Sequence, residues 1–289
     1  MAKKIRIKSK TVNRSASGTA VLLVVMLIFA AFMVLPLVLA VSNSFKPLNE
    51  LWEFPPKLYA KEPTLKNYID MFNIMSGSLV PFTRYIFNTV FITTAGTLGN
   101  LLLTAMCAYP LAKKKFSGRV KLFKIVELTL MFNTTVTAIP SYIVMKYLGF
   151  IDTYYALIIP AFASSLGLYL IKQFMETSIP DTLIEAASID GAGQWKTFLS
   201  IVLPCTKPAL LTQLLLSVQA LWNIGSTSYI FSDEKKTLSY ALSQIVAGGI
   251  ARAGVGAAVT VFMLIVPLTI FIICQSNIID TMSTSGMKD

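Results

Sequence analysis

Six long stretches of predominantly apolar residues divide the chain, with a polar segment between each and the next. A helix needs about 20 mostly apolar residues to cross the hydrocarbon core of a bilayer, and each stretch meets that length. The expected spans cover residues 19–41, 85–111, 123–147, 154–177, 204–224 and 257–279. The pattern therefore predicts an all-α polytopic membrane protein with six transmembrane helices.

The first apolar stretch begins after a basic segment, as the core of a signal peptide does. It also contains Val38-Leu39-Ala40, which resembles a cleavage site. Its apolar run is nevertheless longer than the ~7–15 residues of a signal-peptide core. We therefore expect an uncleaved first helix.

The positive charge is concentrated beside the apolar stretches. The chain carries 25 Lys and Arg against 14 Asp and Glu, a net charge of +11. Residues 1–18 and 113–124 each hold six basic residues and no acid. Such blocks mark the cytoplasmic side of a membrane protein rather than a nucleic-acid-binding face.

This bias predicts the orientation and the division of the chain. Residues 1–18 form a basic cytoplasmic N-terminus, 19–279 the six-span membrane domain and 280–289 a cytoplasmic tail. Residues 111–122 and 178–208 then lie inside as well, whereas 42–84 and 225–256 lie outside. Outer segments of this length suggest a partner outside the membrane, although packing on the bundle would also explain them.

The composition excludes several classes of function. Hydrophobic residues make up 55% of the chain and charged residues 13%, and the mean hydropathy is +0.67. Soluble domains have about a quarter charged residues, so the apolar surplus must face lipid. The absence of histidine excludes histidine-based catalysis and most zinc sites. The three scattered cysteines match neither a disulfide framework nor a metal site. We expect no catalytic residue and no metal.

The polar segment 178–208 reads SIPDTLIEAASIDGAGQWKTFLSIVLPCTKP. Ser178 as N-cap, with Asp181 three residues later, predicts a helix start, and Asp190-Gly191 predicts the end of that helix. A second short amphipathic helix follows, and Leu203-Pro204 predicts the turn into the next span. An ordinary connector lying on the membrane would explain each of these pieces singly.

Their combination resembles the EAA loop of ABC-importer permeases. The matching positions are Glu185, Ala186, Ala187, Asp190, Gly191, Ala192, Phe198, Ile201, Leu203, Pro204 and Pro208. The loop also lies just before the penultimate span, as in that family. Segments 43–46 (Asn-Ser-Phe-Lys) and 63–68 (Pro-Thr-Leu-Lys-Asn-Tyr) resemble the carbohydrate-uptake branch, in particular the smaller permease of the maltose system. One departure from the branch is the tail, which ends in Ser-Gly-Met-Lys-Asp.

The resemblance implies a type I ABC importer permease fold with cytoplasmic termini and a set of partners. These are a second homologous permease, two ATPase subunits that bind ATP and Mg, and an extracytoplasmic solute-binding protein that delivers a sugar. This chain has no glycine-rich phosphate-binding loop, so it is expected not to be an enzyme. The residues implied to contact the ATPase are Glu185, Ala186, Ala187, Asp190, Gly191 and Ala192. The residues implied to pack the loop are Trp195, Phe198, Leu203 and Pro204.

Polar residues inside the apolar stretches are candidates for the substrate pathway. The main ones are Asn88, Asn133, Thr134, Gln213, Gln219, Trp222 and Asn223, with Asn100, Thr135, Ser164, Ser165 and Ser217 beside them. No charged residue lies in the middle of a stretch, which favours a neutral solute. Hydrogen bonding between helices is the alternative explanation for all of them.

Among the other functions, a permease for another solute stays open, and two further classes are disfavoured. The chain fits a permease for amino acids, peptides or phosphorylated solutes as well as one for sugars. A stand-alone secondary carrier would show internal repeats and intramembrane charges, which we do not find. An intramembrane enzyme would need catalytic residues that the sequence lacks.

Overall fold

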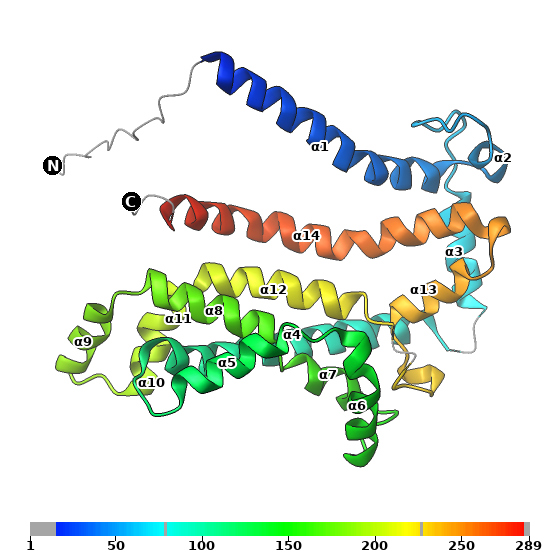
Figure 1. Ribbon diagram of the computed structural model, residues 1–289. Helices are drawn as coiled ribbons and strands as arrows, with labels where there is room; N and C mark the ends of the chain where they lie inside the picture. Colours follow the sequence, from blue (N-terminus) through cyan, green and yellow to red (C-terminus); the bar gives the residue numbers. More distant parts are fainter. Residues whose placement is uncertain (1–15, 78–79, 226–227, 286–289) are drawn as a thin grey trace.

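The computed structural model describes residues 16–77, 80–225 and 228–285, in which every regular element is a helix (Figure 1). Most of the predicted basic N-terminus (1–15) and the end of the tail (286–289) lie outside these ranges. The first elements are α1 (Ala16–Phe45), α2 (Leu48–Leu51), α3 (Lys66–Ser76), α4 (Phe82–Lys113), α5 (Arg119–Thr129), α6 (Thr134–Tyr147), α7 (Tyr155–Ala161) and α8 (Ser165–Ser178). The remaining ones are α9 (Asp181–Ile189), α10 (Gln194–Thr197), η1 (Phe198–Val202), α11 (Leu203–Cys205), α12 (Lys207–Trp222), η2 (Asp233–Lys235), α13 (Leu238–Val246), η3 (Ile250–Arg252) and α14 (Ala253–Ser285).

Four helical segments in the described ranges are long and apolar enough to cross a membrane. They are Ser17–Phe45, Phe82–Lys113, Tyr155–Ser178 and Ala253–Gln275. The fifth predicted span meets the same test only when Gln194–Cys205 is counted together with Lys207–Trp222, to which it is bent by 76°. The long apolar helices of the prediction are thus present, while the count of six is not confirmed.

The third predicted span, 123–147, is not one helix. It is divided between α5 and α6, and Figure 1 shows α6 running at a steep angle to α5. Asn133 starts the second helix, because its side chain accepts a hydrogen bond from the backbone N–H of Thr135 at 2.9 Å. The two helices have 11 and 14 residues, each too short to cross a bilayer alone.

Helix α4 lies at the centre of the bundle and packs against α7, α8 and α12. Close approach depends on its glycines. A Cβ atom on Gly99 would lie 2.0 Å from the ring of Phe162, and one on Gly96 would lie 2.6 Å from the side chain of Leu221. Small residues therefore allow the helix backbones to come together here.

Helix α1 projects away from the rest of the bundle, and α14 lies beside it (Figure 1). The most apolar window of α1 has a mean hydropathy of 3.1, and none of it is buried within this chain. This surface is therefore available to lipid or to another subunit.

Candidate functional site

The segment predicted to receive a partner forms a helix, a turn and a second, bent helical stretch. Helix α9 ends at Ile189 with Asp190 as C-cap, and Gly191 follows with φ of 76°. Only glycine adopts that left-handed conformation without cost, so the predicted end of the helix is confirmed.

The predicted start of this helix is wrong. Ser178 is the last residue of α8, and the N-cap of α9 is Pro180, which has no side chain able to cap it. Ser178-Ile179-Pro180 instead separates two helices, because proline disfavours a helical conformation in the residue before it.

The predicted contact residues differ in exposure. Glu185, Ala186, Asp190 and Gly191 are exposed and Ala192 is half-buried. Ala187 points inward and is 6% exposed, so it packs the helix rather than presenting a surface. Ile189, which the sequence did not single out, is 87% exposed on the same helix.

The packing residues of the loop divide in the same way. Phe198 is buried, with its ring centroid 5.5 Å from that of Tyr109 on α4. Trp195 stands over Phe198 edge-on but stays largely exposed. Leu203 is half-buried and Pro204 exposed. The sharp change of direction occurs at Thr206, beyond the predicted Leu203-Pro204, between α11 and α12.

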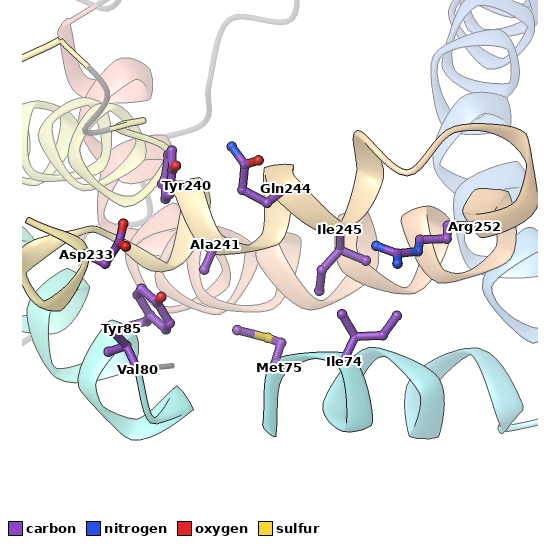
Figure 2. A pocket seen from close by; sticks show the side chains of 10 residues that line it. All are labelled: Ile74, Met75, Val80, Tyr85, Asp233, Tyr240, Ala241, Gln244, Ile245 and Arg252. Carbon is purple, nitrogen blue, oxygen red and sulfur yellow. The ribbon is translucent and has the colours of Figure 1, made fainter. Parts of the chain in front are cut away.

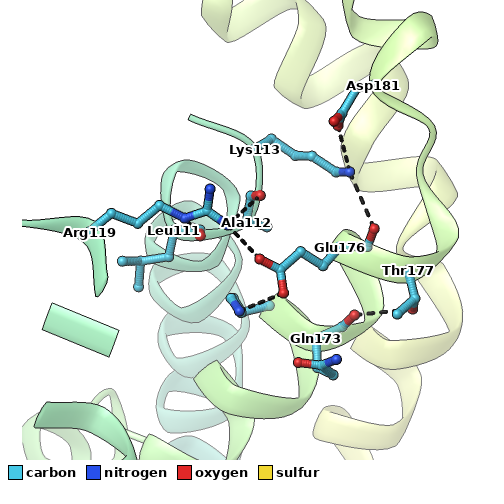
Figure 3. A network of polar contacts seen from close by, with 9 residues as sticks. Leu111, Ala112, Lys113, Arg119, Gln173, Glu176, Thr177 and Asp181 are labelled. Atoms are coloured by element: carbon cyan, nitrogen blue, oxygen red, sulfur yellow. Dashed lines mark hydrogen bonds and ion pairs between the residues drawn. The ribbon is translucent and has the colours of Figure 1, made fainter. Parts of the chain in front are cut away.

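A network of charged side chains connects this segment to α4 and α8 (Figure 3). Lys113 Nζ lies 2.8 Å from Asp181 Oδ1, and Lys172 Nζ lies 2.6 Å from Glu176 Oε2. Arg119 forms an ion pair with the other oxygen of Glu176. The hydrogen bond from Lys113 lowers the pKa of Asp181 below its usual value.

A cavity of about 650 Å³ lies among α4, α6, α7, α8 and α12. Its polar lining centres on Gln213, whose amide nitrogen donates to Asn100 Oδ1 at 2.8 Å and to Ser164 Oγ at 3.2 Å. The Gln213 carbonyl oxygen is buried and has no hydrogen-bond partner among the described residues. Ser217 lines the same cavity and donates to Thr97 at 3.3 Å.

Other candidates of the pathway set lie elsewhere. Gln219 on α12 and Asn223, the residue directly after this helix, are exposed and line a separate pocket of about 370 Å³ against α13 and α14. Trp222 is 6% exposed, and its indole N–H donates to the carbonyl of Met263 at 3.0 Å. In this conformation its ring is packed in the core and is not open to a ligand.

Asn88 is fully buried, and protein groups occupy its amide. Its nitrogen donates to the carbonyls of Glu234 and Lys236 at 2.8 and 2.9 Å, and its oxygen accepts from the hydroxyl of Tyr154 at 2.8 Å. It therefore attaches the 233–236 segment to α4.

The remaining candidates lie at breaks between helices. Asn133 and Thr135 are exposed at the start of α6, and the side chain of Thr134 lies outside the described residues. Ser164 caps α8 by accepting from the N–H of Gly167 at 3.0 Å. Ser165 accepts from the hydroxyl of Thr129 at 2.7 Å.

The two predicted outer segments meet at a pocket of about 300 Å³ between α3 and α13. Figure 2 shows Ile74 and Met75 of α3 facing Ala241 and Ile245 of α13. Asp233, Tyr240, Gln244 and Arg252 form its polar rim.

The sequence segments 43–46 and 63–68 also come together. Asn67 donates to the carbonyls of Ser44 and Lys46 at 2.9 and 2.8 Å, and Tyr68 donates to Ser44 Oγ at 2.8 Å. These hydrogen bonds join the C-terminal end of α1 to α3.

Sequence reasoning missed the roles of Lys113, Arg119 and Glu176. The basic residues predicted only the orientation of the chain in the membrane. No sequence spacing predicts an ion pair between residues about 60 positions apart. The acids at 176 and 181 opposite a basic loop were the one available signal.

Comparison with known proteins agrees with this architecture. Residues 100–283 match the family described as binding-protein-dependent transport system inner membrane component. Protein LplC of Bacillus subtilis is 34% identical over 217 residues, which cover 74% of this chain and 71% of the relative. The polygalacturonan/rhamnogalacturonan transport system permease YtcP of Bacillus subtilis is 30% identical, covering 76% and 75% of the two chains. The sn-glycerol-3-phosphate transport system permease UgpE of Yersinia enterocolitica is 31% identical, covering 69% and 71%.

A solved structure supports the fold. It is a crystal structure of a bacterial ABC transporter involved in the import of the acidic polysaccharide alginate. One of its chains superposes with a TM-score of 0.75 at 24% identity, over 92% of this chain and 99% of that chain. The chain therefore has an ABC-importer permease fold and is a multi-pass protein of the cytoplasmic membrane. With more than half of its length matched, it belongs to the family of binding-protein-dependent transport system inner membrane components.

Proposed function

We propose that this chain is one of two membrane subunits of an ATP-driven importer that moves a sugar or oligosaccharide by alternating access. The observation that carries the proposal is the exposed face of α9 followed by the Gly191 turn, set at the junction of two apolar helices. A short helix of this kind is suited to transmit the motion of a docked partner as a rigid body.

Two ATPase subunits that bind ATP and Mg would dock on this face. Glu185 offers a carboxylate to a basic group of the ATPase. The small side chain of Ala186 lets the ATPase approach the helix backbone, and Ile189 adds an apolar contact. Ala187 was expected to contact the ATPase, but it is buried. We therefore modify that contact: Ala187 packs α9 against the bundle, and the neighbouring exposed residues face the ATPase. The second permease would complete the membrane domain, and the apolar surface of α1 is available to it.

A solute-binding protein would deliver the cargo from outside. The pocket between α3 and α13 lies where the two outer segments join, and this position supports a role in receiving that partner.

The cargo follows from the relatives and from the polar cavity. YtcP is named for polygalacturonan and rhamnogalacturonan, and a relative from Streptomyces coelicolor for diacetylchitobiose. The amides of Asn100 and Gln213 and the hydroxyls of Ser164 and Ser217 suit the donors and acceptors of a sugar, and none of the described residues of the lining is charged. Because one relative is named for sn-glycerol-3-phosphate, a phosphorylated solute is the second candidate for the cargo. Uptake of a labelled oligosaccharide in competition with glycerol phosphate distinguishes the two.

The test of the coupling role is Glu185→Lys in the complex purified from its native membrane. We expect the variant to insert normally, to lose uptake and to co-purify with less ATPase. Glu62→Lys, a charge reversal at an exposed glutamate outside the loop, is the matched control and should transport normally. Normal uptake by Glu185→Lys would refute the proposal, as would transport by the lone chain without an ATPase.

A further inference from the structure

Four helix ends converge on one cluster of charged residues (Figure 3). Lys113 is the last residue of α4, Arg119 the first of α5, Glu176 lies in the last turn of α8, and Asp181 is the first residue of α9. Each end lies near a turn of the chain, so the charged side chains join helix ends that the backbone connects only through these turns.

Arg119 closes the end of α4 while it binds α8. Its Nε donates to the carbonyl of Leu111 at 2.7 Å and its terminal nitrogen to the carbonyl of Ala112 at 3.1 Å. These carbonyls are among the last four of the helix and have no partner within it. The same guanidinium pairs with Glu176, so this one side chain of α5 binds both α4 and α8.

Lys172 and Lys113 complete the connection. The ammonium of Lys172 pairs with Glu176 and lies 3.9 Å from the ring centroid of Phe123 on α5. Lys113 reaches from the C-terminal end of α4 to Asp181 at the N-terminal end of α9, where the helix dipoles favour both charges. Only 5% of the Lys113 side chain is exposed, compared with 75% for Asp181.

Helix α9 is attached to the bundle along one face and exposed along the other. Asp181 is bound to α4, Ile184 packs against the buried cluster between α4 and α8, and Ala187 is only 6% exposed. The other face carries Ile189, which is 87% exposed. A force applied to the exposed face therefore reaches α4 through the attachment at Asp181.

We propose that Lys113 and Asp181, supported by Glu176 and Arg119, form a pivot that transmits movement of α9 to α4. The inference rests on the proposed function in that α9 receives motion from a partner. These are positioning residues, which act through the helices that they join. Because the side chain of Asp181 is 75% exposed, the pair adds little to stability, and its role is to link two helices that move together.

The test uses the complete transporter, reconstituted with its partner subunits, and measures solute taken up per ATP hydrolysed. The variants are Asp181→Asn, Asp181→Lys, Lys113→Glu and the exchange Lys113→Glu with Asp181→Lys. The control is the same exchange at an exposed outer pair, Lys61→Glu with Glu53→Lys, whose side chains are 44% and 40% exposed.

We expect the single variants to lower uptake per ATP by about fivefold or more while the complex still assembles, as for a lost coupling contact. The exchange at 113 and 181 restores the pair but places both charges against the helix dipoles, so uptake per ATP should rise above that of either single charge reversal without reaching the native ratio; the outer control should stay near native. Native uptake per ATP in Asp181→Asn and Asp181→Lys, or an exchange variant no better than the single reversals, overturns the pivot.

Glu185→Lys, measured in parallel, separates the two proposals. If it loses uptake while the Asp181 variants remain native, the pivot fails and the coupling role stands. If all of them remain native, both fail.

Discussion

The carboxylate of Asp152 accepts a hydrogen bond from the backbone N–H of Ser232, with 2.9 Å between the nitrogen and Oδ1. Phe231 N–H donates to the same oxygen at 3.1 Å, and Lys235 pairs with the other oxygen at 3.2 Å. Asp152 itself has φ of 58°, a left-handed conformation that aspartate tolerates better than most residues. One side chain thus holds the 231–235 segment against the turn between α6 and α7.

Replacing Asp152 by asparagine should loosen that segment. Asparagine keeps the backbone conformation but loses the charge, and charge-assisted hydrogen bonds exceed neutral ones by about 1 kcal/mol. We expect faster hydrogen exchange at residues 229–236, measured by mass spectrometry in nanodiscs. Asp233→Asn, at an exposed carboxylate paired with Lys236 three residues away, should leave the exchange of Phe231 and Ser232 unchanged.

The same contact predicts a pH dependence. The hydrogen bonds from Ser232 and Lys235 hold the pKa of Asp152 well below its usual value. A folded-state pKa below the unfolded value of about 3.9 gives a stabilisation that is complete above that pH and is lost as the pH falls toward the depressed value. Protection of residues 229–236, corrected for intrinsic exchange, should be constant from pH 7 to about 5 and decline only below about 3.9. A decline between pH 7 and 5 would contradict this assignment.

Asn88→Ala should destabilise the fold rather than change the substrate preference. The substitution leaves the carbonyls of Glu234 and Lys236 and the hydroxyl of Tyr154 without their partner, at a cost of about 1–3 kcal/mol. The measurement is thermal unfolding in mild detergent. Asn223→Ala is the control, since Asn223 is exposed and its amide nitrogen donates to the carbonyl of Gln219. A native melting temperature together with an altered substrate specificity would instead assign Asn88 to the substrate pathway.

Gly167→Ala tests the polar cavity. A Cβ atom at this position would lie 2.4 Å from the amide of Gln213, so the amide must move and its bonds to Asn100 and Ser164 must weaken. We expect uptake to fall while insertion is retained. Gly256→Ala, where the nearest side-chain atom lies at 3.7 Å, is the control and should transport normally. Normal uptake by Gly167→Ala would mean that the geometry at Gln213 does not matter for transport.

Local patterns were sufficient for the long apolar helices and for the end of α9. Periodicity and length predict a span, and Asp190-Gly191 predicts a helix end from the conformational freedom of glycine alone. They failed at 123–147, where apolar residues on both sides hid the break that Asn133 makes by capping α6. That signal was present in the sequence but was outweighed by hydropathy.

Tertiary contacts decided what the sequence could not. Among the polar residues of α12, Gln213 and Gln219 have the same character, yet one lines the inner cavity and the other an outer pocket. The helical face that each residue occupies depends on how α12 packs against α4 and α14. The packing of Phe198 on Tyr109 likewise joins two residues about 90 positions apart in the chain, which no local pattern predicts.

Ile189→Ser should weaken binding of the ATPase while leaving the fold intact. Ile189 is 87% exposed and packs nothing in this chain that its removal would disturb. If the partner buries it, the loss of about 1.5–3 kcal/mol corresponds to at least about tenfold weaker binding.

The measurement is the affinity of the detergent-solubilised membrane subunits for the purified ATPase. Val120→Ser, at an aliphatic side chain on α5 that is 77% exposed, is the matched control and should bind normally. Because both substitutions remove exposed apolar surface, only a difference between them reports on docking. Equal affinity of the two variants for the ATPase would show that the exposed end of α9 lies outside the interface.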